Sequence, residues 1–224
     1  MAMIFGADSV QPANSPLSNG YDLFSWVMRK RSFPSFWARR FTGEQAMTEE
    51  EIEFLRNKNC RIALVFDDLT EVGVSSVNGE DDALRAVSAA KALGVPADGT
   101  IALFAAIGSD WSVSHNWMLS YASMLQSQGY VPGFIGNTDS SKNCSFDREC
   151  GHFLQATGDV EHYGAVYWAT APELNGEPDE WKPFCPSDMT RDRIDLWQNS
   201  PIVCDSVKAD TVYGRDESIL RYMW

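Results

Sequence analysis

The sequence predicts an α/β fold: a single, small (β/α)8 TIM barrel spanning residues 1–224. Eight strand-like segments follow one another along the chain, and helix-like segments separate most of them, which is the pattern of a parallel sheet. The alternative is an open doubly wound sheet. That fold usually carries a glycine-rich phosphate turn after its first strand, whereas "GADSVQPANS" contains no GxGxxG. With 224 residues, 44% of them hydrophobic, the chain can bury one sizeable core.

The first five strand segments alternate with well-marked helices. "RIALVF" is a continuous apolar run, typical of a strand buried on both faces. The helix before it opens with Thr48 as N-cap and Glu51 as the expected capping-box partner. A later helix ends at Gly94, a residue suited to the left-handed position after a helix. The expected strands are residues 3–8, 35–41, 61–66, 100–106 and 131–136, and the expected helices are 21–31, 48–59, 80–93, 114–128 and 145–155.

The last third of the chain keeps the strands but loses most of the helices. Strand-like segments occur at residues 165–170, 193–198 and 207–213. The links between them are rich in proline and contain little helical periodicity, and a short helix over residues 217–224 ends the chain. We therefore expect degenerate helices in this part of the barrel.

Charge and hydropathy argue against nucleic acid and membrane partners. The chain has 18 Lys and Arg against 31 Asp and Glu, a formal net charge of -13, so most of its surface would repel a phosphate backbone or an anionic membrane. No apolar run approaches the roughly 18 residues of a membrane span, and the first residues lack the order of a secretory signal.

The five cysteines have neither the paired CxxC spacing of a zinc site nor the density of a disulfide scaffold. We read them as small buried hydrophobic residues, and we expect Cys60, which precedes an apolar strand, to be a free thiol. Cys144 and Cys150 are close enough in sequence to bridge in an oxidising compartment.

No metal or cofactor is expected. His115, His152 and His162 are scattered along the chain, and none takes part in a ligand motif such as HExxH. The nucleophile motif GxSxG is also missing, which disfavours the commonest class of serine hydrolase.

Acidic residues follow several of the predicted strands. In a barrel of this type the active site forms at the carboxyl ends of the strands. Asp8 ends the first strand and Asp210 lies inside the last; these strands are neighbours in a closed barrel, and a carboxylate inside a strand costs desolvation unless it is used. Asp110 lies in the loop after the fourth strand. The other acids at strand ends, Asp67, Asp68 and Glu173, have the ordinary positions of loop and capping residues.

Tryptophans lie at the same strand ends. Trp111, Trp168 and Trp197 each stand at or just after the end of a predicted strand, where they could form flat platforms for sugar rings or simply belong to the core. Carboxylates beside indole rings are the groups that glycoside hydrolysis requires, since one acid protonates the leaving oxygen and another acts as nucleophile or base.

Several segments together resemble a known family. They are "FGAD", "ARRFTG", "MTEEEI", "ALRAVSAAKALGVPADGTIALFA", "GYVPGFIG", "LWQ" and "VKADTV". In this order they resemble the glycoside-hydrolase-like TIM-barrel domains, distant relatives of the family 25 glycoside hydrolases, the muramidases. The resemblance runs over nearly the whole chain, and it implies a barrel that acts on polysaccharide, with extracellular action.

The resemblance also implies roles for individual residues. Asp8 matches the aspartate that ends the first strand of the family, Asp210 matches the one in its last strand, and Gln198 matches the glutamine after the seventh-strand tryptophan. The fourth strand departs from the family pattern. Ile107 stands where relatives carry an acid, and the nearest carboxylate is that of Asp110.

Two functions follow as hypotheses. The first is a glycoside hydrolase acting on a cell-wall polysaccharide, with peptidoglycan as substrate, in which Asp8 and Asp110 are the working pair and Asp210 positions or tunes them. The alternative is a catalytically inactive barrel that serves as a carbohydrate-binding or cell-wall-associated module. The expected substrate-binding residues are Trp111, Trp168, Trp197, Gln198, Arg40 and Asp67.

Overall fold

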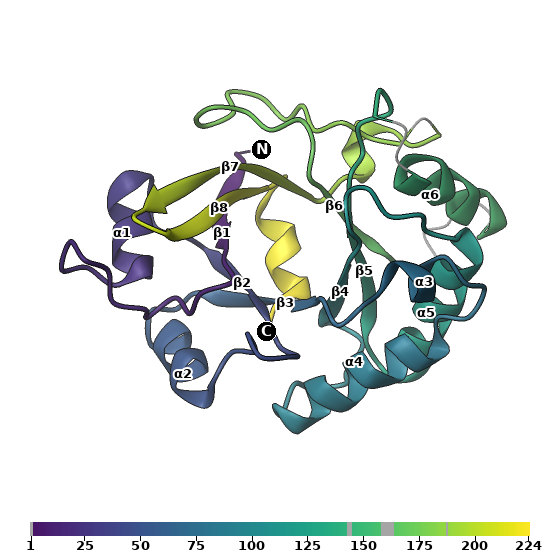
Figure 1. The fold of residues 1–224 in the computed structure, drawn as a ribbon, viewed down its shortest axis with the longest axis horizontal. Helices are drawn as coiled ribbons and strands as arrows, with labels where there is room; N and C mark the ends of the chain where they lie inside the picture. The colour runs from purple at the N-terminus through teal and green to yellow at the C-terminus, as the bar shows by residue number, and fades with distance from the viewer. Residues whose placement is uncertain (1, 143–144, 158–163, 187) are drawn as a thin grey trace.

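A computed structural model describes residues 2–142, 145–157, 164–186 and 188–224, and its eight strands close into a barrel (Figure 1). The strands pair in chain order, and the last pairs with the first. The predicted barrel and each of its eight predicted strands are therefore confirmed. The strands are β1 (Ile4–Asp8), β2 (Phe36–Arg40), β3 (Arg61–Phe66), β4 (Ala102–Ala106), β5 (Val131–Gly136), β6 (Val166–Ala169), β7 (Leu196–Cys204) and β8 (Val207–Gly214).

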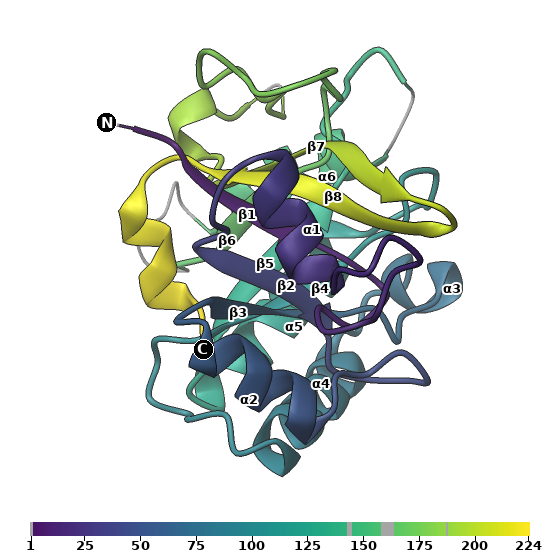
Figure 2. The ribbon, with the colours of Figure 1, turned by 90° about the vertical axis from the view of Figure 1, so that its left-hand side faces the viewer.

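Helices surround the barrel over its first two thirds, as Figures 1 and 2 show. The five predicted helices in this part of the chain form, together with a short one, α3, that the sequence did not predict. After β6 the described residues form only 3-10 helices, so the expected loss of helix is confirmed. The helices are α1 (Leu23–Lys30), α2 (Glu49–Asn57), α3 (Glu71–Val74), α4 (Glu80–Ala92), α5 (His115–Ser127), α6 (Ser145–Ala156), and the 3-10 helices η1 (Arg191–Arg193) and η2 (Glu217–Tyr222).

The expectation that all strands run parallel is wrong for β8. Strands β1 to β7 run parallel to one another, but β8 runs antiparallel to both β7 and β1. Only Asp205 and Ser206 separate β7 from β8, and Asp205 takes a positive φ of 54° in this turn. Two residues can close a hairpin, whereas a parallel crossover needs about a dozen or more. The first residues of β8 therefore lie at the carboxyl end of the barrel.

The inside of the barrel is filled by apolar side chains from alternate positions of each strand. Phenylalanine rings take the space beside glycines: a Cβ on Gly6 would clash with Phe36, and one on Gly133 with Phe104. The helix η2 covers one end of the barrel with Ile219 and Met223. The inner cluster is Ile4, Phe36, Ala38, Ala63, Val65, Ala102, Phe104, Val131, Ile135, Val166, Trp168, Leu196 and Val212.

A second, larger apolar cluster lies outside the barrel, between the strands and the surrounding helices. It takes the strand residues that alternate with the inner set, which is why the buried strands read as continuous apolar runs. Among the helices in the described ranges, none is long and apolar enough to cross a bilayer.

A buried ion pair replaces half of the predicted capping box. Thr48 Oγ1 accepts the backbone N–H of Glu51 at 3.3 Å, as expected of an N-cap. The Glu51 carboxylate, however, turns inward and binds Arg39 through two hydrogen bonds of 2.6 and 3.1 Å. Both side chains are fully buried. Because a buried guanidinium without a counter-charge is costly, the Glu51 carboxylate pairs with Arg39 and does not cap the helix.

Cys60 is expected to resist thiol reagents in the native protein. It is a free cysteine, 3% exposed, and burial raises its pKa to about 12, so almost no thiolate forms at neutral pH. Peptide mapping after brief iodoacetamide treatment should find Cys60 unmodified in native protein and modified in urea, with the more exposed Cys204 as internal control. Rapid native labelling of Cys60 would contradict this. Cys150 is also a free, buried thiol, and Cys144, its suggested partner, lies outside the described residues.

Candidate functional site

Polar side chains form a ring at the carboxyl end of the barrel. In each strand of the inner cluster, side chains at every second position point inward. The next inward-facing position, beyond the apolar ones and at the carboxyl end of the barrel, holds a polar residue in seven of the eight strands. These residues are Asp8, Arg40, Asp67, Asn137, Thr170, Gln198 and Asp210.

Two carboxylates of this ring come from residues that are paired across neighbouring strands. Asp8 is the last residue of β1, and the antiparallel register places it beside Asp210 of β8. Gln198, from β7, donates a hydrogen bond of 3.1 Å to Asp210 Oδ2, and Lys208 Nζ lies 3.7 Å from Asp210 Oδ1. The structure thus brings together three residues that the sequence singled out: Asp8, Asp210 and Gln198.

Arg40 connects two of the acids. Its Nη1 donates a hydrogen bond to Asp8 Oδ1, and its Nε lies 3.6 Å from Asp67 Oδ2. The Arg40 and Asp8 side chains are 17% and 6% exposed, so solvent screens this ion pair little. Arg40 and Asp67 therefore belong to the ring through charge pairing.

Burial changes the acidity of the facing carboxyls. It raises the pKa of Asp210 to about 6, with a further contribution from the nearby charge of Asp8, while Lys208 and Arg40 oppose the change. Burial also raises the pKa of Asp8, against the opposing effect of Arg40. Two close carboxyl groups cannot both ionise easily, so they titrate as a pair. The better shielded cation, Arg40, contacts Asp8, whereas Lys208 is 61% exposed. We therefore place the charge on Asp8 and the retained proton on Asp210.

Two adjoining cavities open at this end of the barrel. One, of about 200 Å³, is lined by Asp210, Gln198 and Lys208, and the other, of about 630 Å³, is lined by Asp110 and several polar neighbours. Thr170 and Glu173 line both cavities. Of the two paired carboxyl groups, that of Asp210 borders the smaller cavity, and Asp8 lines neither of the two.

The fourth strand provides no carboxylate at its own end. Ile107 is buried in the cluster between the barrel and the helices. Asp110, three residues further along the loop, is exposed and lines the larger of the two cavities. The structure thus places Asp110 at the same end of the barrel as Asp210, in the neighbouring cavity.

The expected tryptophan platforms are wrong for two of the three residues. Trp168 is 1% exposed and lies inside the barrel, with its ring 5.7 Å from that of Phe104. Trp197 is fully buried, and its indole N–H donates to the Pro172 carbonyl at 2.9 Å. Both lie at positions of their strands that face core, so neither offers a face to a sugar. Trp111 is half-buried in the β4–α5 loop, where it packs against the outer apolar cluster.

Three residues of the site were missed by the sequence reasoning. Asn137 and Thr170 follow β5 and β6 in the inward register, and Lys208 precedes Asp210 by two residues on the same face of β8. A signal existed in each case, because the two-residue period of a strand continues past its apolar part. Glu173, read from the sequence as a loop residue, also lines both cavities.

The histidines are not all scattered in space. The Nδ1 atoms of His115 and His152 both approach Glu149 Oε2, and the two imidazole rings contact each other with centroids 5.3 Å apart. The expectation failed here because the residues come from two helices, α5 and α6, so no short sequence spacing could reveal them. His162 lies outside the described residues.

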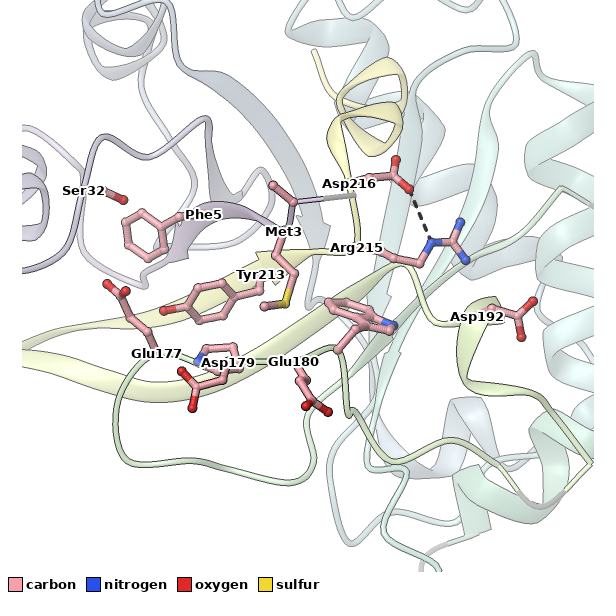
Figure 3. A pocket seen from close by; sticks show the side chains of 13 residues that line it. Met3, Phe5, Ser32, Glu177, Asp179, Glu180, Asp192, Tyr213, Arg215 and Asp216 are labelled. Atoms are coloured by element: carbon pink, nitrogen blue, oxygen red, sulfur yellow. Dashed lines mark ion pairs between the residues drawn. The ribbon is translucent and has the colours of Figure 1, made fainter.

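A larger cavity, of about 920 Å³, lies away from the carboxylate ring (Figure 3). It borders the first residues of β1 and the last residues of β8, at the other end of these strands from Asp8 and Asp210. Figure 3 shows Phe5 and Tyr213 on the same side of it, with ring centroids 5.8 Å apart, and Glu177 next to Tyr213. It contains none of the predicted site residues, so we assign the chemistry to the ring.

Comparisons with known proteins agree with this fold. No protein-family profile and no curated protein sequence matches the chain. Among solved structures, an uncharacterized protein of B. stearothermophilus matches with a TM-score of 0.81 and 23% identity, covering 99% of this chain and 100% of the other. The Tat-secreted protein Rv2525c of Mycobacterium tuberculosis matches with a TM-score of 0.60 and 16% identity, covering 97% and 98%.

A family GH25 lysozyme from Aspergillus fumigatus matches with a TM-score of 0.54 and 13% identity, covering 98% of each chain. Other similar structures include a muramidase from Acremonium alcalophilum. The resemblance read from the sequence is thus confirmed at the level of structure. At these identities the similarity establishes the fold, and this chain has the TIM-barrel fold found in the family 25 lysozymes.

Proposed function

We propose that the protein is a glycoside hydrolase that acts on a cell-wall polysaccharide, with peptidoglycan as its substrate. The observation that carries the proposal is the facing pair of Asp8 and Asp210 at the carboxyl end of the barrel, with an Asp210 pKa of about 6. A carboxyl group that keeps its proton near neutral pH can donate it to a leaving oxygen. The fold shared with proteins named lysozyme and muramidase supports peptidoglycan as the substrate.

The roles of the carboxyl groups follow from their surroundings. Asp210 donates its proton to the glycosidic oxygen, and Gln198 holds the Asp210 carboxyl in place. Asp8, kept anionic by Arg40, stabilises the positive charge that develops on the sugar ring. Asp110 lies in the adjoining cavity, where a carboxylate can activate water. Trp111 supplies the aromatic face at the rim.

The pH dependence of hydrolysis tests this assignment. The rate constant kcat/KM is expected to fall as pH rises through about 6, because Asp210 then loses the proton it must donate. Replacing Lys208 with methionine should move this fall to higher pH, since Lys208 lowers the pKa of Asp210. Release of reducing ends from peptidoglycan, measured over a range of about pH 4 to 8, gives the profile. A rate that stays constant or rises above pH 6 would exclude Asp210 as the acid.

An inactive carbohydrate-binding barrel is the second candidate. Two observations favour it: Arg40 already pairs with the Asp8 carboxylate, and β4 is followed by the apolar Ile107 in place of an acid. Sedimentation with insoluble peptidoglycan distinguishes the two functions. Binding without release of reducing ends at any pH supports the binding module, and release that depends on Asp210 supports the enzyme.

A further inference from the structure

Three side chains with metal-binding atoms meet between α5 and α6. His115 is the first residue of α5, and Glu149 and His152 lie three residues apart on α6. The Nδ1 atoms of His115 and His152 are 2.8 and 3.5 Å from Glu149 Oε2. One donor atom from each of the three residues lies within 4.8 Å of the other two.

These separations bracket the spacing of ligands around a zinc ion. With metal–ligand distances of about 2.0–2.2 Å in a tetrahedron, ligand atoms are roughly 3.3–3.6 Å apart, so small side-chain movements would bring the three atoms to this spacing. Two imidazoles and one carboxylate are also the donor set of open zinc sites, in which water completes the shell. The side chains of His115, Glu149 and His152 are 32%, 12% and 44% exposed, so solvent reaches the cluster.

We propose that His115, Glu149 and His152 form a binding site for a divalent transition metal ion, with Zn²⁺ as the expected ion and water at the fourth position. Glu149 Oε2 is the atom that both histidine nitrogens approach, so one carboxylate oxygen and two imidazole nitrogens already lie close together. The proposal does not depend on the hydrolase function.

One cation competes with the metal. Arg148 Nε donates to Glu149 Oε1 at 2.9 Å, and its positive charge would oppose a bound divalent ion. The Arg148 side chain is 61% exposed, so it can move into solvent at little cost. Removal of this side chain should therefore strengthen metal binding, which gives the test a variant with the opposite sign.

A metal ion bound here would hold a loop of the candidate site against α6. The β4–α5 loop, residues 107–114, carries Asp110 and Trp111 and leads directly into His115. It already contacts α6 through Ser145, whose Oγ accepts the Val113 N–H at 2.6 Å and donates to the Trp111 carbonyl at 3.1 Å. Glu149 also accepts the backbone N–H of His115 at 3.2 Å, and the metal would reinforce this contact between the end of the loop and α6.

Calorimetric titration of zinc into chelator-treated, tag-free protein tests the site. We expect one equivalent to bind, His152→Ala to weaken binding by about 100-fold or more, and Arg148→Ala to tighten it, because loss of a direct ligand should exceed the 10–100-fold effect typical of outer contacts. His152 is exposed, and circular dichroism confirms that the variant is folded. Absence of zinc binding by the wild type, or equal binding by wild type and His152→Ala, would overturn the proposal.

Discussion

Replacing Asp210 with asparagine is expected to lower the turnover of peptidoglycan by about 100-fold or more while changing KM little. Asparagine keeps the size of the side chain and can still accept the hydrogen bond from Gln198, but it has no proton to donate. General acid catalysis contributes typically ~10²–10⁴ to a rate and little to ground-state binding, so the loss should appear in kcat. Reducing-end release under saturating substrate measures it.

The carboxylates that face or adjoin Asp210 provide the comparison. Asp8→Asn should show a loss of similar size, because it removes the negative charge paired with Asp210, and Asp110→Asn tests the acid of the adjoining cavity. Asp98→Asn is a matched control, since Asp98 is an exposed aspartate before β4, at the opposite end of the barrel. Asp210→Asn and Asp98→Asn enzymes of equal activity would end the hydrolytic proposal for this site.

Replacing Glu51 with leucine is expected to destabilise the protein by about 3–5 kcal/mol, because it leaves the Arg39 guanidinium buried without a counter-charge. The same variant removes the acceptor of the Ala13 N–H, which lies 2.7 Å from Glu51 Oε1. Arg39 also donates to the carbonyls of Ser9 and Val10, directly after Asp8, so the network fixes the end of β1. Urea unfolding gives the free energy of unfolding.

The double variant separates the net contribution of the ion pair to stability from the cost of leaving one buried charge unpaired. Arg39→Met combined with Glu51→Leu replaces both charges by apolar groups of similar size, and buried pairs replaced in this way often keep most of the stability. The double variant should therefore be more stable than Glu51→Leu alone. A loss in Glu51→Leu within about 0.5 kcal/mol of the wild type, the range of ordinary surface changes, would show that Arg39 finds another partner or solvent.

Much of the candidate site was predictable because strands can be recognised from their local sequence pattern. The strand-like segments located all eight strands, and the closure of the last strand on the first marked Asp8 and Asp210 as neighbours, whereas the family resemblance indicated Gln198. The antiparallel direction of β8 also has a local cause, because the two-residue link after Cys204 can only form a hairpin. Our sequence-based prediction did not use this link.

The residues that were misplaced depend on contacts between distant parts of the chain. Trp168 and Trp197 have the same local pattern as a rim residue, and only the neighbouring strands and the 172–181 segment show that both indoles are covered. Glu51 reads as a capping residue until Arg39, on another element, approaches it.

The sequence by itself determined the order of strands and helices, the closed barrel, and the identity of the acids at its carboxyl end, because these follow from periodicity and from where apolar runs stop. Only the tertiary structure decided which acid keeps its proton and which histidines meet, since a pKa depends on burial and on charges from other elements, as with Asp8 beside Asp210 and Glu149 between His115 and His152. Sequence spacing records neighbours along the chain, whereas acidity and metal binding depend on neighbours in space.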